Sequence, residues 1–271
     1  MEKTVTFVIQ GPLTIDGVRA IKNYSMMGPV IVSCWPTDSI QLIEQARALG
    51  ARVLINQPIN RNRYNFQNIR SHINSSLKGI LNSNTNFIVK VRSDEYFTDL
   101  RKIVSAIYLR PDKIAVSNFF FRNNVLFHPS DHIIAGTRDF LKGMFEESLD
   151  FIDNKINEKY NDSTRVPVGE IGLKEDYTFR YVTAEMTFCL SYLKTKGIDV
   201  VKDISGMTEE EIRSYHKRVM KENYSLVRAS DLGNFLFRFK SNPDYLGPTA
   251  FTKEEEFLNY KIKSITSLDE L

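Results

Sequence analysis

The sequence contains only two cysteines, Cys34 and Cys189, too few for a disulfide framework or a cysteine-based metal motif. No apolar run approaches the roughly 18 residues that a membrane-spanning helix needs, and the run near the N-terminus is too short for a signal peptide. These absences favour a reducing compartment. We therefore expect a cytoplasmic protein with at most peripheral contact with a membrane.

The sequence also lacks a strong excess of charge of one sign. It contains 36 Lys and Arg residues and 33 Asp and Glu residues, which give a net charge of +3. So small a net charge does not favour nucleic acid as a partner. Glycine-rich phosphate loops are missing as well, since neither G-x-G-x-x-G nor G-x-x-x-x-G-K-[ST] occurs. Rossmann dehydrogenases and P-loop NTPases are therefore poor fits.

Apolar strands that alternate with amphipathic helices predict an α/β fold with a mainly parallel sheet in the first part of the chain. The predicted strands cover residues 5–9, 29–34, 52–55 and 87–92, and the predicted helices cover residues 14–27, 39–49 and 68–81. Later residues predict a hairpin of strands 114–121 and 125–127 and a strand over 132–135. They also predict a helix capped by Thr137, a helix over 183–196 that Gly197 ends, and a helix over 208–222 with a capping box of Thr208 and Glu211. Segments 154–176 and 229–252 read as loops.

The predicted strand over residues 87–92 breaks abruptly into Arg92, Ser93, Asp94 and Glu95. In open α/β sheets, ligands bind outside the carboxyl ends of the strands. A carboxylate there can hold a divalent cation, which in turn holds phosphates, so we predict Asp94 as a metal ligand and Glu95 as a supporting group. A charged loop that begins the next helix is the alternative.

Two further strand ends reach the same edge of the sheet. Gln10, Gly11 and Pro12 follow the first strand, where Gly11 allows the backbone to approach a ligand closely or simply makes a tight turn. Trp35 and Asp38 follow the second strand. Asp38 either accepts hydrogen bonds from a base or ribose, or caps the next helix together with Thr37.

Cations near the start of the predicted helix 68–81 are not favoured by the helix dipole, which suggests an anionic ligand. These cations are Arg61, Arg63 and Arg70, of which Arg70 is the strongest candidate, although solvated surface arginines are an equal alternative.

Acids and histidines later in the chain are candidates for catalysis. His128, Asp131 and His132 lie close together, but zinc sites usually show four clear ligands, so Asp131 could equally orient an acceptor hydroxyl. Glu185 begins an otherwise apolar helix, where removal from water makes a carboxylate a better general base. Ordinary pairing with the helix dipole is the alternative.

Several motifs together resemble the WavE-type lipopolysaccharide-synthesis proteins, a family of glycosyltransferases with a GT-A-like fold. The motifs are Val8-Ile-Gln-Gly-Pro-Leu13, Ile31-Val-Ser-Cys-Trp35, Val89-Lys-Val-Arg-Ser-Asp94, His128-Pro-Ser-Asp131 and Ala184-Glu185. The similarity covers roughly residues 4–195. It implies a GT-A-like three-layer α/β/α fold, with a catalytic region over residues 1–200 and a C-terminal helical extension over 201–271 packed on the same domain.

The resemblance also implies a nucleotide-sugar donor, with a UDP-sugar favoured, bound by Gln10, Gly11 and Pro12 with Trp35 or Asp38 nearby. The triplet from Arg92 to Asp94 falls where GT-A enzymes carry a D-x-D motif for Mn²⁺ or Mg²⁺. Because Arg92 replaces the first acid, the metal is in question, and Arg92 could itself offset the diphosphate charge. Ser93 is a further residue expected to bind the nucleotide sugar. Glu185 resembles the base that deprotonates the acceptor hydroxyl.

The leading hypothesis is a glycosyltransferase of surface-glycan synthesis (lipopolysaccharide, capsule or glycoprotein glycan) that uses a glycan or lipid-linked acceptor. A non-catalytic nucleotide- or carbohydrate-binding protein of the same fold is the first alternative, and Arg92 supports it. A metal-dependent phosphate-ester hydrolase or nucleotidyltransferase that uses Asp94, Asp131 and His132 is the second.

Overall fold

The computed structural model describes residues 4–59, 68–122, 125–155, 166–174, 181–233, 235–236, 250–251, 265 and 267–271. Its centre is a seven-stranded sheet with the order β3-β2-β1-β4-β7-β6-β8. The strands are β1 (Val5–Gln10), β2 (Val30–Cys34), β3 (Arg52–Ile55), β4 (Phe87–Arg92), β6 (Ile114–Ser117), β7 (Ile133–Thr137) and β8 (Tyr224–Val227). β7 runs antiparallel to both of its neighbours, and every other pair is parallel. The predicted mainly parallel sheet is confirmed.

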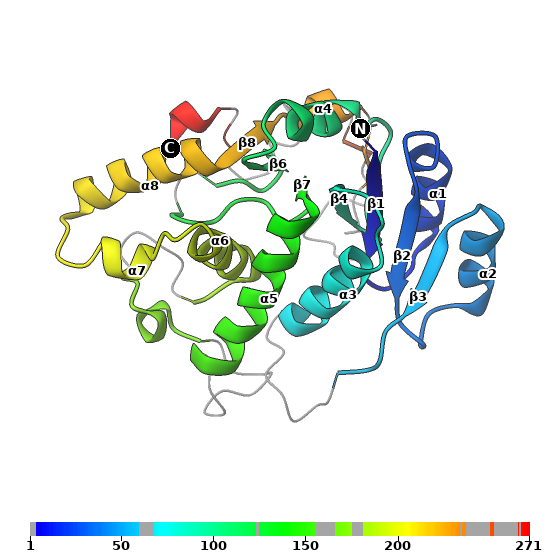
Figure 1. Cartoon of the computed structure of the whole chain (residues 1–271), viewed down its shortest axis with the longest axis horizontal. Coiled ribbons are helices and arrows are strands. Elements are labelled where there is room, and N and C mark those ends of the chain that lie inside the picture. The colour runs from blue at the N-terminus through cyan, green and yellow to red at the C-terminus, as the bar shows by residue number, and fades with distance from the viewer. Residues whose placement is uncertain are drawn as a thin grey trace.

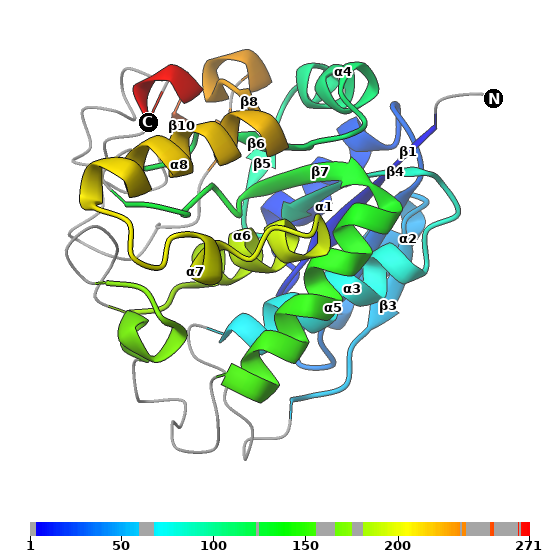
Figure 2. The same cartoon turned by 60° about the vertical axis from the view of Figure 1, so that its left-hand side comes forward.

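Helices cover both faces of this sheet (Figures 1 and 2). One core contains α1 (Ile15–Tyr24), α2 (Ile40–Ala48) and α4 (Arg101–Leu109). The other contains α3 (Ile69–Leu81), α5 (Arg138–Lys155), α6 (Ala184–Thr195), α7 (Val200–Asp203) and α8 (Glu209–Asn223). Along β1, Phe7 and Ile9 join the first core while Val8 joins the second, as the two-residue period of a strand requires. The expected three-layer α/β/α arrangement is thereby confirmed.

The C-terminal part of the chain contributes to both sheets of the structure. β8 pairs with β6 at the edge of the central sheet. A small antiparallel sheet joins β5 (Tyr96–Phe97), β9 (Phe235–Leu236) and β10 (Ala250–Phe251). Neither β8 nor α4 has a counterpart among the predicted elements. The division into a catalytic region and an extension near residue 200 stays a prediction.

The predicted hairpin of residues 114–121 and 125–127 is wrong. β6 ends at Ser117, and the chain then turns, with the Phe121 N–H donating to the Asn118 carbonyl. Phe120 and Phe127 have φ angles of 62° and 55°, which no strand can include. The apolar character of this segment has another cause, because Phe121 and Phe127 fill the core from a loop. The predicted loops 154–176 and 229–252 lie partly outside the described residues.

The helix caps predicted at Thr137 and Thr208 are confirmed. The Thr137 hydroxyl accepts a hydrogen bond from the Phe140 N–H at 3.3 Å. Thr208 and Glu211 form the expected capping box at the start of α8. Thr183 caps α6, which places Glu185 in the first turn of that helix.

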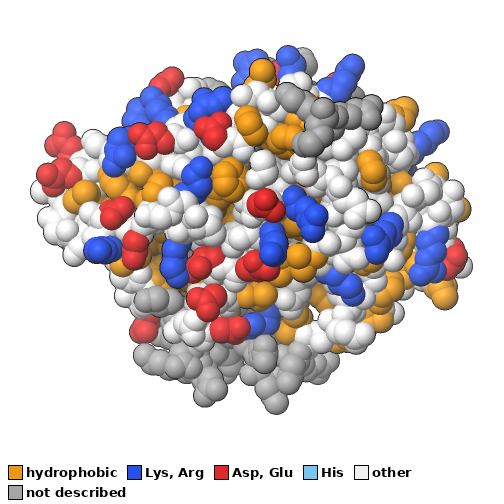
Figure 3. All heavy atoms as spheres, in the orientation of Figure 1, with side chains coloured by type: hydrophobic (Ala, Val, Ile, Leu, Met, Phe, Trp, Pro, Cys, Tyr) orange, Lys and Arg blue, Asp and Glu red, His pale blue; other side chains and the backbone are white. Residues whose placement is uncertain are grey.

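No helix in the described part of the chain is both long and apolar enough to cross a bilayer. On the face shown in Figure 3, Lys and Arg side chains lie among Asp and Glu side chains. That face therefore presents no extended surface of one charge, in agreement with the small net charge of +3.

Close packing of α3 on β1 yields a stability prediction. A Cβ at Gly79 would lie 2.3 Å from Val8 Cγ1, so Gly79→Ala overpacks this interface. The overpacking costs about 1–3 kcal/mol, of which better helix propensity offsets about 1 kcal/mol. We expect a lower free energy of unfolding in urea. Gly169→Ala is the control, because a Cβ there meets nothing within 4 Å. Equal stability of the Gly79→Ala protein and the wild type would contradict the close packing.

Candidate functional site

A cavity of about 690 Å³ opens at the carboxyl ends of β1, β2 and β4. Nine predicted site residues line it: Gln10, Gly11, Pro12, Trp35, Arg92, Ser93, Asp94, Asp131 and Glu185. Asn68, Ser71, His72 and Ala184 complete the lining. The parallel strand order therefore brings together residues that lie up to 175 positions apart in the sequence (from 10 to 185).

The ends of β1 and β4 are joined through Ser93. Its N–H donates to the Gln10 carbonyl at 2.9 Å, and its hydroxyl donates to the Pro12 carbonyl at 2.6 Å. Gly11 has a φ of 115°, and a Cβ there would lie 2.9 Å from Ser93 Oγ. A glycine is therefore required at this turn. The Ser93 hydroxyl holds the turn, and this contact fixes the neighbouring residues Arg92 and Asp94.

Arg92 lies among three carboxylates. Its Nε and Nη2 donate to the two carboxylate oxygens of Asp94 at 3.0 and 3.2 Å. Glu95 Oε1 lies 3.4 Å from Nε, and Asp131 Oδ2 lies 3.8 Å from Nη1. Burial alone would lower the pKa of Arg92, but the charges of Asp94, Asp131 and Glu95 outweigh it and raise that pKa. Arg92 thus stays charged at any pH at which the protein folds.

Lys90 supports the same cluster from inside the core. It is fully buried, and it shares a face of β4 with Arg92 because the two are separated by one residue. Its Nζ donates to the Asp131 main-chain carbonyl at 2.7 Å. Burial, which outweighs the nearby carboxylates, lowers the pKa of Lys90 to about 8. Glu95, also fully buried, is in contact with His132 Nδ1 and lies 3.4 Å from Arg92 Nε, so both side chains belong to the same charged cluster.

Asp131 is held in its ionised form. Burial alone would raise the pKa of Asp131, but His132, Arg92, His72 and Lys90 together keep it well below its usual value. His72 Nδ1 lies 3.4 Å from Asp131 Oδ2. Burial, and then the charges of Lys90 and Arg92, lower the pKa of His72 well below 6.5, so this imidazole is neutral near pH 7.

His72 is absent from the predicted site residues. A signal for it exists in the sequence, because His72 falls three residues after Ile69 and directly before Ile73. It is therefore a polar residue on the apolar face of the predicted helix. Its contact with Asp131 depends on how α3 is placed beside the chain that precedes β7.

Glu185 has a different environment from Asp131. Its Oε2 lies 3.5 Å from His128 Nε2, and the side chain is 21% exposed at the cavity. Burial lowers the pKa of His128, although the charge of Glu185 opposes this effect, so Glu185 faces a neutral imidazole near pH 7. Asp131 is 4% exposed and lies near the cations Arg92 and Lys90, whereas Glu185 is a partly exposed carboxylate that a ligand in the cavity can reach.

Asp38 and Arg70 do not line the cavity. Asp38 Oδ2 accepts hydrogen bonds from the N–H groups of Leu13 and Trp35, both at 2.9 Å, so it ties two loops together rather than capping α2. Arg70 is buried and pairs with Asp153 of α5 at 2.5 Å. Arg61 and Arg63 lie outside the described residues. The predicted binding roles of all these residues stay predictions.

The donor set around Asp94 does not fit a divalent cation. Both oxygens of Asp94 already accept hydrogen bonds from a guanidinium. A divalent ion about 4 Å from that guanidinium would be repelled by about 8 kcal/mol at an effective dielectric constant of 20. In the described ranges, no group of three or more His, Cys, Asp or Glu side chains is arranged to hold a metal ion.

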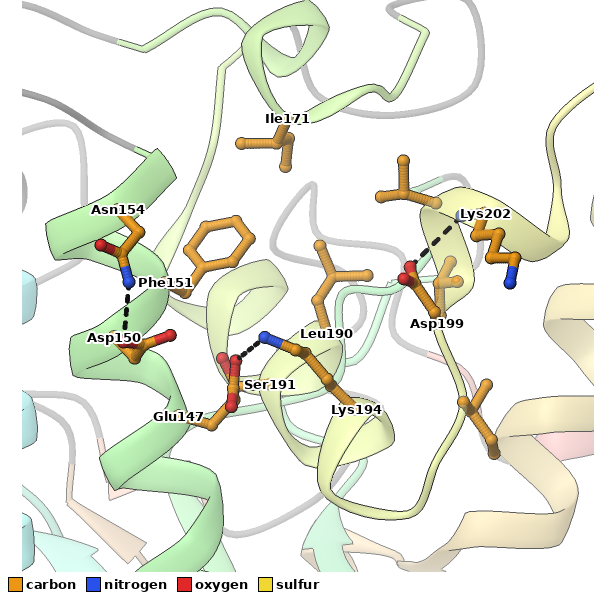
Figure 4. Close-up of a pocket in the computed structure, with 13 residues that line it drawn as sticks. Glu147, Asp150, Phe151, Asn154, Ile171, Leu190, Ser191, Lys194, Asp199 and Lys202 are labelled. Carbon is orange, nitrogen blue, oxygen red and sulfur yellow. Dashed lines mark hydrogen bonds and ion pairs between the residues drawn. The ribbon is translucent and has the colours of Figure 1, made fainter.

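A second cavity, of about 300 Å³, lies between α5, α6 and α7 (Figure 4). Five of its polar side chains are paired with groups of the protein itself. Glu147 pairs with Lys194, Asn154 donates to Asp150 at 2.7 Å, and Asp199 accepts from the Lys202 N–H at 3.3 Å. None of the predicted site residues lines it, so the cavity at the strand ends is the candidate active site.

The fold and the site define an α/β protein with a charged cavity at the strand ends of its central sheet. The sequence matches the family described as WavE lipopolysaccharide synthesis over residues 5–269, and the chain belongs to this family. No curated protein matches the sequence.

Solved structures show only distant likeness. A glucosyl-3-phosphoglycerate synthase from Mycobacterium tuberculosis, in complex with Mn²⁺, UDP and phosphoglyceric acid, is 12% identical with a TM-score of 0.37 over 56% of this chain. This chain spans 64% of the length of that enzyme. HddC from Yersinia pseudotuberculosis is 8% identical with a TM-score of 0.35, covering 51% of this chain and 79% of that one. A CMP:2-keto-3-deoxy-manno-octonic acid synthetase complexed with CTP is 9% identical with a TM-score of 0.36, covering 54% of this chain and 78% of that one. Scores this low carry no argument about function.

The buried Lys90 yields a prediction about pH. Its pKa in the folded protein is about 8, below the ordinary value of 10.5, so the folded state loses this proton first. Below pH 8 the folded state bears the full free-energy cost of burying the charged Lys90 ammonium group. This cost decreases as the pH rises from about 8 to about 10.5, so the free energy of unfolding increases over that range. Relative to Lys90→Met, the wild type should gain about 3 kcal/mol of unfolding free energy across that range in urea titrations. A difference that does not change with pH would contradict the burial of a charged Lys90.

Proposed function

We propose that this protein is a glycosyltransferase that moves a sugar from a nucleotide-sugar donor to an acceptor hydroxyl in the synthesis of lipopolysaccharide or a related surface glycan. The main support for this proposal is a single cavity. It is lined by the end of β4, by the turn that follows β1 and by the partly exposed carboxylate of Glu185 at the start of α6. Membership of a lipopolysaccharide-synthesis family supports the same reaction class. In this proposal the acceptor is a glycan or a lipid-linked glycan, and the protein acts in the cytoplasm at the membrane surface.

In the proposed reaction, the nucleotide lies along Trp35 and the turn from Gln10 to Pro12, and its diphosphate faces Arg92. A cavity of about 690 Å³ is within the range of small-molecule sites. Glu185 removes the proton of the acceptor hydroxyl, and the acceptor oxygen forms a bond to the anomeric carbon. The bond from that carbon to the diphosphate breaks, and the nucleoside diphosphate leaves with the electron pair.

A donor panel tests this proposal. UDP-, GDP-, CMP- and dTDP-sugars are added separately, and we expect one of them, with a UDP-sugar favoured, to raise the melting temperature. Ligand at about 100 times its Kd stabilises the folded state by about 2.7 kcal/mol. The same donor should release its nucleotide when an acceptor is supplied, and Asp94→Ala should lose this release because Arg92 loses its anchor.

Binding without nucleotide release would favour the non-catalytic alternative, and release of inorganic phosphate would favour a hydrolase. The absence of any donor response would contradict both the transferase and the nucleotide-binding proposals.

Glu185→Gln tests the role of the base. The amide keeps the shape of the side chain but accepts no proton, so kcat should fall by about 10²–10⁴-fold while KM for the donor is unchanged. Glu147→Gln, at the second cavity, is the matched control and should keep full activity. A Glu185→Gln protein with wild-type kcat would remove Glu185 from the mechanism.

A further inference from the structure

We infer that Arg92, in place of a divalent cation, carries the positive charge that faces the donor diphosphate, so that transfer requires no metal. This inference rests on the proposed function and concerns the same cavity. The contacts of Asp94 with a guanidinium differ from the two carboxylates that a D-x-D motif would offer to a divalent cation.

The Arg92–Asp94 pair has the same net charge as a D-x-D motif with a bound divalent cation. A D-x-D motif carries two negative charges, and a bound divalent cation brings the sum to zero. In this chain the pair of Arg92 and Asp94 sums to zero without a cation. The guanidinium also occupies the position that an ion would need, because it bonds both oxygens of Asp94 at 3.0 and 3.2 Å.

Arg92 retains hydrogen-bond donors for an anion. Nε and Nη2 bond Asp94, whereas Nη1 makes no hydrogen bond to any described residue. Asp131 Oδ2 lies 3.8 Å from Nη1, which is beyond hydrogen-bond distance. The side chain is 20% exposed and lines the cavity. Guanidinium N–H groups match the geometry of phosphate oxygens, so Nη1 is suited to bind the diphosphate.

The guanidinium is preorganised for this task. Asp94 holds it from one side, and the bonds of Ser93 to Gln10 and Pro12 fix the backbone between the two residues. No reorganisation is then needed when charge develops on the leaving group. As the bond to the anomeric carbon breaks, its electron pair moves to the diphosphate oxygen. Arg92 stabilises that charge without giving up a proton, and the acceptor proton goes to Glu185.

The deciding experiment uses the wild-type protein. Melting-temperature shifts with UDP, GDP and CDP, and nucleotide release from the active donor, are measured in excess EDTA and in excess Mn²⁺. We expect values in the two buffers to agree within about twofold. Binding of Mn²⁺ alone is followed by electron paramagnetic resonance, and no stoichiometric site is expected. A response seen only with Mn²⁺, or a stoichiometric Mn²⁺ site, overturns the assignment to Arg92 and leaves the transferase proposal intact. No response in either buffer contradicts the proposed function itself.

Arg92→Gln adds an independent test, because its neutral amide removes the charge. Where this variant keeps a cooperative melting transition, the affinity for the responding nucleoside diphosphate in EDTA should fall at least tenfold. Arg110→Gln is the matched control, since Arg110 pairs with Asp112 on the surface and lies outside the cavity lining. Unchanged affinity in a folded Arg92→Gln protein would overturn the inference.

Discussion

The compensation of buried negative charge around Arg92 is the constraint on which the site depends. Three carboxylates lie within 4 Å of one guanidinium, and breaking such a pair leaves an uncompensated charge that costs about 3–5 kcal/mol. This constraint accounts for the composition of β4. Lys90 and Arg92 occupy one face, where the carboxylates need cations, while Val89 and Val91 join the apolar core on the other. The strand therefore serves a core on one side and a charged site on the other.

The site is also supported from far along the chain. The Phe127 N–H donates to Nδ1 of His216 on α8 at 3.3 Å, and the two rings are in edge-to-face contact. Burial lowers the pKa of His216 to about 3, so it remains a neutral acceptor. Phe127 has a positive φ, a conformation that persists only when its surroundings hold it. Residues beyond position 200 thus stabilise the loop that directs His128 toward Glu185.

Much of this site was predictable because strand ends in a parallel sheet meet at one edge. Gln10, Trp35 and Asp94 could be grouped by that rule before any contact was known. The rule does not say what each side chain contacts. Asp38 holds a turn and Arg70 pairs with α5, although both carry charges suited to a ligand. The buried aromatics near Phe120 looked like a strand because burial and strand formation leave the same apolar signature.

The sequence by itself determined the α/β class, the helix caps and the replacement of an acid by Arg92, because these follow from neighbours a few positions apart. Only the tertiary structure decided that Arg92 binds Asp94 through two nitrogens, that Asp131 is surrounded by cations and that Glu185 faces a neutral imidazole. Charge pairing acts over a few ångströms, and the fold alone determines which distant segments come that close.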